Sequence, residues 1–406
     1  MRCGQGRLPA EVARRLVDAD EMAVNRTNQP TSRWGESLDT RAEVCSECAR
    51  TAPKPFSEMQ EQRVTIRQLA RLSGVSVGTV SKALNGYTDV NPETRERIMR
   101  LASELDYTPA AAARSLVTQR SHVIGVVLDT GEGHPDLQHP FFHDVMAGLK
   151  NEIGASGFDL LLFASERPGN GYGRHSYLKR ARHHNVDGVV VMGLDPEDPE
   201  VARLARSEMP TVGVDAPLEG PNTTFVISDN ARGARLAVDH LHGLGHRRIA
   251  TITGLLETRP AADRLRGYRA ALQEHGLAYR DELVAYGDFY TDSGRRAMAQ
   301  LLALEEPPTA VFAASDMMAL GAIRAAGDAG LSVPGDISVV GFDDMQLAGH
   351  MNPPLTTLRQ DKGGLGSAAG RVMARIVEGD ESASEQIVVL PVELIERESS
   401  APPARG

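Results

Sequence analysis

The stretch of sequence that decides the fold reads Val64-Thr-Ile-Arg-Gln-Leu-Ala-Arg-Leu-Ser-Gly-Val-Ser-Val-Gly-Thr-Val-Ser-Lys-Ala-Leu-Asn85. Apolar residues recur in it at helical spacing, Gly74 and its neighbours interrupt them, and a second helical run begins at Ser76. Gly74 can adopt the positive φ that a tight turn needs, and the Ser76 hydroxyl suits a helix N-cap. Two short helices joined this tightly predict a helix-turn-helix.

A third helix follows in the same segment. Asn91 is placed to cap it, and Pro92 suits its first position because the missing N–H costs nothing there. Apolar residues recur on one face of this helix: Ile98, Leu101, Ala102 and Leu105. We therefore expect three helices around one small core, in a DNA-binding domain spanning residues 62–108.

The second helix would enter the major groove of DNA with its N-terminal residues near the base edges. Val77 and Gly78 can offer bases only apolar contact or close approach, whereas Lys82 can reach guanine O6 and N7. The hydroxyl groups of the same helix are better suited to phosphate oxygens: Ser76, Thr79 and Ser81. Helix periodicity alone leaves open a three-helix module that binds another protein.

The charge of the chain is divided unevenly along its length. The 406 residues carry 44 Lys and Arg against 54 Asp and Glu, a net −10 that would argue against a nucleic-acid partner. Residues 61–120, however, sum to +3, and residues 121–406 sum to −13. A short basic segment thus precedes a large acidic one, and the length predicts two or more domains.

The first sixty residues lack clear apolar periodicity. We interpret residues 1–60 as a disordered leader or a mis-assigned start, with Met59 as the hypothetical natural start, which intact-mass measurement would test. All three cysteines lie here, and Cys45 and Cys48 lack the further ligands that a zinc site needs. No apolar run approaches the ~18 residues of a membrane span, and no signal peptide is evident. We expect a cytoplasmic protein without metal or cofactor.

The stretch Val64–Asn85 closely resembles the DNA-binding headpiece of the LacI/GalR family of transcription regulators. The likeness covers about 340 residues and continues through Thr94-Arg95, Leu105-Asp-Tyr107 and Pro109. The variable recognition positions are Val77 and Gly78, and Lys82 stands where many members carry Arg. The resemblance and the residue types together place DNA contacts at Thr65, Ser76, Val77, Gly78, Thr79, Ser81, Lys82, Asn85, Ala113 and Leu116.

Residues 109–121 read by themselves as an alanine-rich linker helix ending near one large apolar residue, Leu116. The resemblance implies that this segment is the hinge helix, which orders on operator DNA and packs against its dimer mate in the minor groove. Leu116 would then be the side chain that wedges between base pairs. The alternative is an ordinary core leucine.

Residues 122–398 alternate short apolar runs with helical stretches, which predicts parallel strands buried on both faces. We expect strands at residues 123–128, 159–163, 188–192, 211–214, 248–253, 310–313 and 337–341. This pattern predicts two doubly wound α/β units in tandem with a ligand cleft between them. It resembles the effector and dimerisation domain of the family, which has the fold of periplasmic sugar-binding proteins. We expect a disordered tail at residues 399–406.

The resemblance also assigns an effector site. The stretch His139-Pro-Phe-Phe142 matches the segment where an aromatic ring lines the ligand, and Arg264 matches the arginine that pairs with vicinal hydroxyls. The expected effector-binding residues are Phe141, Phe142, Asp215, Arg264, Phe289 and Asp316. The alternatives are ordinary core aromatics, a surface or capping arginine and a helix N-cap at Asp316. Asp229 and Asp343-Asp344 are interpreted as structural caps.

These observations predict a DNA-binding transcription regulator: a homodimer on a palindromic operator, repressing carbohydrate-utilisation genes until a small sugar binds. The alternative is a purine-type corepressor, which would use the same domains but would strengthen operator binding instead of weakening it. A solute-binding protein would need an export signal and no headpiece. An enzyme is disfavoured because the loop Gly169–Gly173 lacks dinucleotide-loop spacing and no catalytic triad or metal-spaced histidine set appears. The sequence shows no leucine heptad near its end, which favours a dimer over a tetramer.

Overall fold

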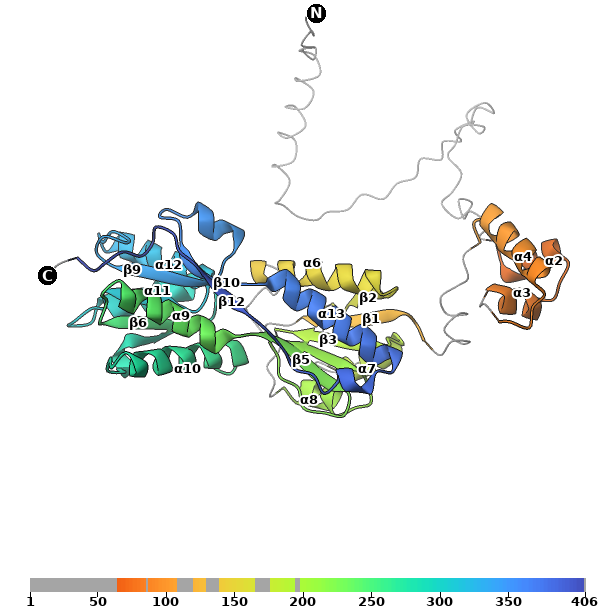
Figure 1. The fold of residues 1–406 in the computed structure, drawn as a ribbon, viewed down its shortest axis with the longest axis horizontal. Coiled ribbons are helices and arrows are strands. Elements are labelled where there is room, and N and C mark those ends of the chain that lie inside the picture. Colours follow the sequence, from red (N-terminus) through yellow and green to blue (C-terminus); the bar gives the residue numbers. More distant parts are fainter. Residues whose placement is uncertain are drawn as a thin grey trace, which may run out of the picture. The chain divides into compact units, whose positions relative to one another are not determined.

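The computed structural model describes residues 64–84, 87–107, 120–128, 139–164, 176–193 and 198–404 (Figure 1). The expected leader, most of the expected hinge segment, Asn85, Ala113 and Leu116 lie outside these ranges. None of the helices within them has the length and apolar character needed to cross a membrane.

The N-terminal part of the described chain is a bundle of α2 (Ile66–Ser73), α3 (Val77–Leu84) and α4 (Pro92–Glu104). The expected turn and caps are present. Gly74 has a φ of +68°, the Ser76 hydroxyl accepts from the Thr79 N–H at 3.0 Å, and the Asn91 side chain accepts from the Glu93 N–H at 2.9 Å. Leu69, Val80 and Ile98 are fully buried in the core between the helices.

One apolar residue of α2 departs from the expected pattern. Leu72 is 62% exposed, whereas Ser73 is buried. Positions separated by three, four and seven residues share a helix face, so Ser73 completes the face that begins at Ile66, and Leu72 falls outside it. The Ser73 hydroxyl is satisfied by donating to the Leu69 carbonyl at 2.7 Å.

The remaining described residues form two six-stranded sheets. The first has the order β11-β5-β4-β3-β1-β2, and all its pairs are parallel. Its strands are β1 (Val123–Leu128), β2 (Asp159–Leu162), β3 (Gly188–Met192), β4 (Thr211–Val214), β5 (Thr223–Ser228) and β11 (Val388–Leu390). Helices α6 (Pro140–Ala155) and α13 (Lys362–Glu378) cover one face, and α7 (Tyr177–His183) and α8 (Pro199–Ala205) cover the other.

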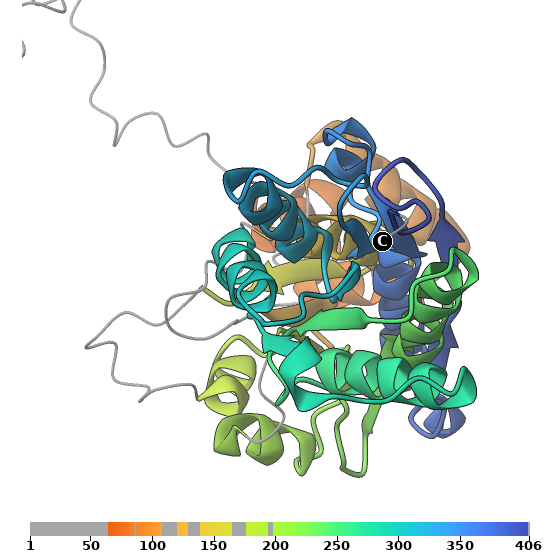
Figure 2. The ribbon, with the colours of Figure 1, turned by 90° about the vertical axis from the view of Figure 1, so that its left-hand side faces the viewer.

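The second sheet has the order β12-β10-β9-β8-β6-β7, with only β12 antiparallel to its neighbour. Its strands are β6 (Ile249–Thr253), β7 (Val284–Tyr286), β8 (Ala310–Ala313), β9 (Ser338–Asp343), β10 (Thr356–Gln360) and β12 (Val392–Ile395). Helices α9 (Asn230–Gly243) and α10 (Arg259–Glu274) cover one face, and α11 (Thr291–Leu302) and α12 (Asp316–Asp328) the other (Figure 2). Short 3-10 turns lie at Asp281–Leu283, Gln346–His350 and Glu381–Ala383.

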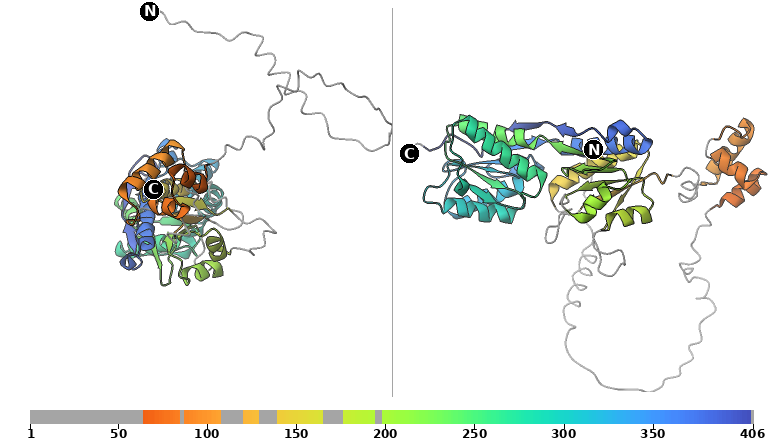
Figure 3. Two further views of the ribbon diagram at one scale, coloured as in Figure 1. Left: turned by 90° about the vertical axis from the view of Figure 1, so that its right-hand side faces the viewer. Right: turned by 90° about the horizontal axis from the view of Figure 1, so that it is seen from below.

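The two α/β units are not in tandem, which corrects the expectation. Within the described residues the chain passes between the sheets at three places: after β5, after β10 and between β11 and β12 (Figure 3). Helix α13 and strand β11 therefore return to the first unit. The crossovers bond to one another, because the Asp229 N–H donates to the Leu390 carbonyl at 2.8 Å and the Ser228 hydroxyl to Gln360 Oε1 at 2.7 Å.

The expected disordered tail is wrong for residues 399–404, which the structure describes. Ser399 is fully buried, its hydroxyl donates to the Val339 carbonyl at 2.6 Å, and the Ala401 N–H donates to the Ser338 hydroxyl at 3.0 Å. The buried ring of His246 also bonds the Ala401 carbonyl at 2.9 Å. These contacts with the second unit fix the position of a segment that, from its composition alone, was expected to be disordered.

Candidate effector site and DNA-binding surface

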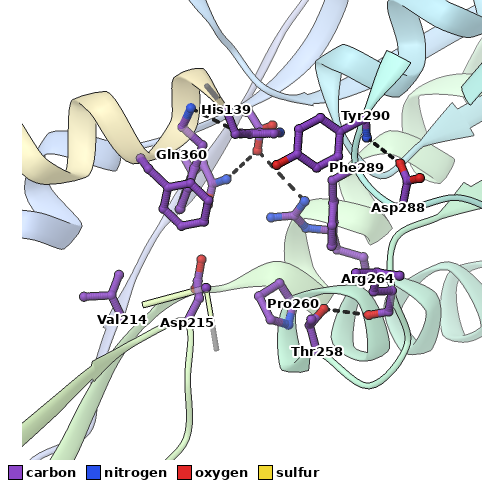
Figure 4. A pocket seen from close by; sticks show the side chains of 15 residues that line it. His139, Val214, Asp215, Thr258, Pro260, Arg264, Asp288, Phe289, Tyr290 and Gln360 are labelled. Carbon is purple, nitrogen blue, oxygen red and sulfur yellow. Dashed lines mark hydrogen bonds and ion pairs between the residues drawn. The ribbon is translucent and has the colours of Figure 1, made fainter. Parts of the chain in front are cut away.

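A cavity lies between the two α/β units, where the carboxyl ends of their strands converge (Figure 4). Its empty volume, including the part open to solvent, is about 780 Å³. Its described lining is His139, Phe141, Phe142, Gly193, Val214, Asp215, Leu255, Thr258, Pro260, Arg264, Asp288, Phe289, Tyr290, Asp343 and Gln360. Aromatic and other apolar side chains dominate this lining.

Five of the six expected effector residues line this cavity: Phe141, Phe142, Asp215, Arg264 and Phe289. Asp316 does not, and the structure does not support its expected role. Its carboxylate is fully buried and accepts from the Thr357 hydroxyl at 2.5 Å and the Met345 N–H at 2.7 Å. Both oxygens are thus occupied by the protein, and burial raises the pKa of this carboxyl well above its usual value. Asp316 joins the start of α12 to the segments after β9 and in β10.

Arg264 is held by groups from several elements. Its Nε donates to Asn230 Oδ1 at 2.7 Å and its Nη1 to the Ala314 carbonyl at 2.5 Å. Its guanidinium lies 3.6 Å from the ring centroid of Phe342, and Nη1 is 3.9 Å from the Asp343 carboxylate. Burial lowers its pKa, and the neighbouring carboxylates act in the opposite direction. The planar cation is therefore fixed in orientation before any ligand binds.

Asp343 was interpreted as a structural cap, but it lines the cavity. Its carboxylate accepts from Gln360 Nε2 at 2.6 Å, and Gln360 in turn accepts from Ser228. The cavity wall is thereby bonded to two of the crossovers between the units. Asp229, in contrast, is confirmed as the cap of α9, where its carboxylate accepts from the Arg232 N–H at 3.1 Å.

Asp215 directly follows β4 and has a φ of +55°, a left-handed conformation that aspartate tolerates better than most residues. The residue as a whole is half-buried, but its Oδ1 is covered and has no hydrogen-bond partner among the described residues. Burial raises the pKa of Asp215 to about 6, and the charge of Arg264 partly opposes this shift. An unpaired buried carboxylate oxygen in a cavity is a candidate ligand acceptor.

His139 and Tyr290 are cavity residues that the sequence analysis did not assign. His139 is the N-cap of α6, and its Nδ1 accepts from the Phe141 N–H at 3.4 Å. Its ring meets that of Tyr290 edge to face at 5.3 Å between centroids, a contact that joins the two units. The available signal was Pro140, because a proline at the first helical position marks the preceding residue as the cap.

The exposed side of α3 carries most of the expected DNA contacts that the structure describes. Val77 is 42% exposed, Gly78 and Lys82 are also exposed, and Thr79 and Ser81 are half-buried. The Lys82 ammonium lies 2.5 Å from the Asp89 carboxylate, an exposed ion pair that the sequence analysis missed. The hydrogen bond to Asp89 raises the pKa of Lys82. Thr65, just before α2, is exposed as well.

A helix-turn-helix and a two-unit ligand cavity in one chain define a class of protein, the ligand-responsive DNA-binding regulators. In the described part of the chain, no three His, Cys, Asp or Glu side chains lie close enough together to hold a metal ion. Comparisons with known proteins then identify the family within this class.

Residues 65–110 match the profile of bacterial regulatory proteins of the lacI family, and residues 238–400 match a periplasmic binding protein-like domain. The chain is 38% identical to the HTH-type transcriptional regulator CelR of Thermobifida fusca, over 84% of this chain and 99% of that protein. It is 35% identical to the ribose operon repressor of Escherichia coli K12, over 83% and 99% of the two chains. This protein therefore belongs to the LacI family of transcription regulators and is not an enzyme.

Solved structures agree with this assignment. A CelR–cellobiose complex matches with a TM-score of 0.62 and 35% identity, over 83% of this chain and all of that one. The Lac repressor dimer bound to operator and the anti-inducer ONPF matches with a TM-score of 0.70 and 31% identity, over 84% and all of the two chains. The expected fold class, a helix-turn-helix headpiece before a periplasmic-binding-protein-like effector domain, is confirmed.

Proposed function

We propose that this regulator represses carbohydrate-utilisation genes and that a small sugar releases it from its operator. The observation that carries this proposal is the cavity, which combines aromatic walls with the fixed guanidinium of Arg264 and the unpaired carboxylate oxygen of Asp215. Aromatic faces suit the C–H face of a sugar ring, and the charged groups suit its hydroxyls. Cellobiose is bound in the CelR complex, and ribose in a related LacI-family regulator from Enterococcus faecium.

The proposed mechanism is linkage between the cavity and the DNA-binding parts. A ligand that contacts both units favours one of their relative positions, and the crossovers bonded through Gln360 and Ser228 would transmit that preference. The hinge helix, residues 109–121, would order on the operator and insert Leu116 beside Ala113 into the minor groove. A coupling of ~1–3 kcal/mol would change operator affinity by about 5- to 150-fold.

We propose that the working unit is a homodimer in the cytoplasm, where the operator DNA is. Two helix-turn-helix units related by a two-fold axis match a palindromic operator with half-sites about one helical turn apart. The related Lac repressor binds its operator as a dimer. A dimer also brings together the paired hinge helices that this mechanism requires.

A purine-type corepressor is the second candidate. The chain is 37% identical to a PurR repressor from Erwinia tasmaniensis, over 83% of this chain and 97% of that protein. The rings of Phe141, Phe289 and Tyr290 could equally stack on a purine base. In this scheme ligand binding would strengthen DNA binding instead of weakening it.

Operator selection followed by DNA retardation tests these alternatives. The protein itself would select its site from a randomised DNA pool, and we expect a palindromic sequence. Ribose, glucose, cellobiose, hypoxanthine and guanine would then be added one at a time to the complex. Release by a sugar supports the proposal, tighter binding with a purine supports the second candidate, and no response to any of them contradicts both.

A matched pair of variants locates the response in the cavity. Arg264→Lys keeps the charge but loses the planar donor pair, so we expect operator binding to persist and the ligand response to weaken at least tenfold. Arg266→Lys is the control, because Arg266 lies on the same helix with a 61% exposed side chain in an ion pair with Asp263. Equal loss of response in both variants would contradict a role for the cavity.

A further inference from the structure

An ion pair joins α3 to the loop that precedes α4. The Lys82 ammonium, in the last turn of α3, lies 2.5 Å from Asp89 Oδ2, and the two side chains are 52% and 54% exposed. Ion pairs as exposed as this one contribute little to folding stability. A carboxylate beside a DNA-binding helix is also repelled by the DNA phosphates. Stability therefore does not explain why Asp89 lies here.

The loop that carries Asp89 is attached to the headpiece on both sides of this residue. The Tyr87 N–H donates to the Lys82 carbonyl at 3.1 Å, and the Arg95 guanidinium of α4 donates to the Tyr87 carbonyl. Directly after Asp89, the Val90 side chain is buried in the core of the headpiece. The backbone thus holds Asp89 in a defined place next to the Lys82 ammonium.

The ammonium of Lys82 can bind a base while it stays paired with Asp89. It has three N–H donors, and Asp89 accepts one of them. Guanine presents two neighbouring acceptors in the major groove, O6 and N7, which the remaining donors can reach. Because guanine is uncharged, the carboxylate does not repel it as it repels an anion. Lys82 can therefore serve Asp89 and one guanine at the same time.

A phosphate group would compete with Asp89 for the same ammonium. Bound to Lys82, it would bring a second anion next to the Asp89 carboxylate, and the two would repel each other. Lys82 and Asp89 also sum to zero charge, so the pair gains little from the counterion release that drives non-specific DNA binding. The ion pair thus disfavours phosphate contacts more strongly than a guanine contact.

We propose that Asp89 is a positioning residue that directs Lys82 to a guanine of the operator and suppresses contacts of Lys82 with the phosphates of non-specific DNA. Lys82 touches the DNA, and Asp89 acts through it. This inference goes beyond the proposed sugar-released function, because it depends on the proposed DNA contact of Lys82 and not on any effector.

Asp89→Asn in the full chain tests this role, because asparagine keeps the size of the side chain and removes its charge. The probes are an operator that the wild-type protein selects from a randomised DNA pool and a duplex of scrambled sequence. Fluorescence anisotropy over a series of KCl concentrations measures both affinities. We expect the ratio of operator to scrambled affinity to fall at least fivefold. The salt dependence of binding to the scrambled duplex should steepen by about one phosphate contact per headpiece. An unchanged or higher ratio overturns the inference.

Glu104→Gln is the matched control for net charge. Glu104 is also an exposed carboxylate of the headpiece, but it lies at the end of α4. The substitution changes the charge of the headpiece by the same amount, so we expect both duplexes to bind more tightly by the same factor. If Glu104→Gln lowers the ratio as much as Asp89→Asn does, net charge explains the effect and the inference fails.

Lys82→Met tests whether Asp89 acts through Lys82, because it keeps an unbranched stem and removes the ammonium. We expect this variant to lose a guanine preference at one position of each selected half-site. Adding Asp89→Asn to it should leave the affinity ratio unchanged within about twofold. A further fall of the ratio in the double variant overturns the inference. No sugar is present in these experiments, so such a failure leaves the proposed function standing, whereas a wild-type protein that selects no sequence contradicts that function itself.

Discussion

At the scale of single residues, the cavity is made of groups whose chemistry depends on burial. Asp215 is an ordinary Asp in the sequence, but its place after β4 covers one carboxylate oxygen and gives the residue a φ of +55°. Asp316, placed similarly after an apolar strand, accepts two hydrogen bonds from the protein and does not line the cavity. The sequence could name both as acceptors, but only their tertiary surroundings distinguish them.

The raised pKa of Asp215 predicts a pH-dependent stability difference. Burial raises it from 3.8 to about 6, so between these pH values the folded state holds a proton that the unfolded state releases. This residue therefore lowers the free energy of unfolding as pH rises from about 4 to about 6. Asp215→Asn removes that effect and should be ~1–3 kcal/mol more stable than the wild type at pH 7.

Urea denaturation at pH 7 and at pH 4 would measure this difference. We expect the advantage of Asp215→Asn to disappear near pH 4, where the wild-type carboxyl is protonated in the folded protein. A stability difference of the same size at both pH values would mean that burial does not raise the pKa of the Asp215 carboxyl.

At the scale of elements, local signals predicted the headpiece helices well. Gly74, Ser76 and Asn91 act on groups a few residues away, so their roles in turning and capping are visible in the sequence. All seven expected strands are present, with small differences at their ends. Five of the described strands were missed: β5, β7, β10, β11 and β12. Strands β5 and β10 contain several hydroxyl or charged residues, and β7 and β11 are only three residues long, so their burial depends on neighbours elsewhere in the chain.

The packing of α6 against α13 gives a prediction for one glycine. A Cβ on Gly366 of α13 would lie 1.9 Å from the Val145 carbonyl oxygen of α6. This distance is far shorter than any contact between non-bonded atoms. Gly366→Ala must push the two helices apart, so we expect it to lower the free energy of unfolding by at least ~1–3 kcal/mol. Chemical denaturation would measure this change.

Gly154→Ala is the matched control. Gly154 lies in α6, and a Cβ there meets nothing within 4 Å. Alanine is the better helix former, so we expect no loss and a gain of up to ~1 kcal/mol. If both alanine variants behave alike, close packing at Gly366 does not limit the approach of the two helices.

At the scale of the whole molecule, the effector part depends on contacts between residues far apart in the sequence. Helix α13 and strand β11 return to the first unit, and the segment 399–404 packs on the second. Every described residue of the cavity lining lies between His139 and Gln360. The complete ligand site should therefore be contained in residues 120–404.

A fragment of residues 120–404 tests whether these residues contain the complete ligand site and whether DNA binding needs the N-terminal helices. It contains both sheets and the described cavity lining but lacks α2, α3 and α4. We expect it to bind the effector with the affinity of the full chain, within a factor of about three, and to show no operator binding in retardation experiments. Loss of effector binding by a folded fragment, as judged by circular dichroism, would show that the sensor needs the N-terminal part.

The sequence by itself determined the helix-turn-helix, the parallel α/β character of the larger part and five residues of the cavity lining. These features depend on periodicity, on caps and on motifs a few residues long. Only the tertiary structure decided the three crossovers, the packing of the C-terminal segment, the entry of His139 and Asp343 into the cavity and the withdrawal of Asp316 from it. The physical reason is that hydrogen-bond satisfaction and burial are set by neighbours that are distant in sequence, and no local pattern encodes them.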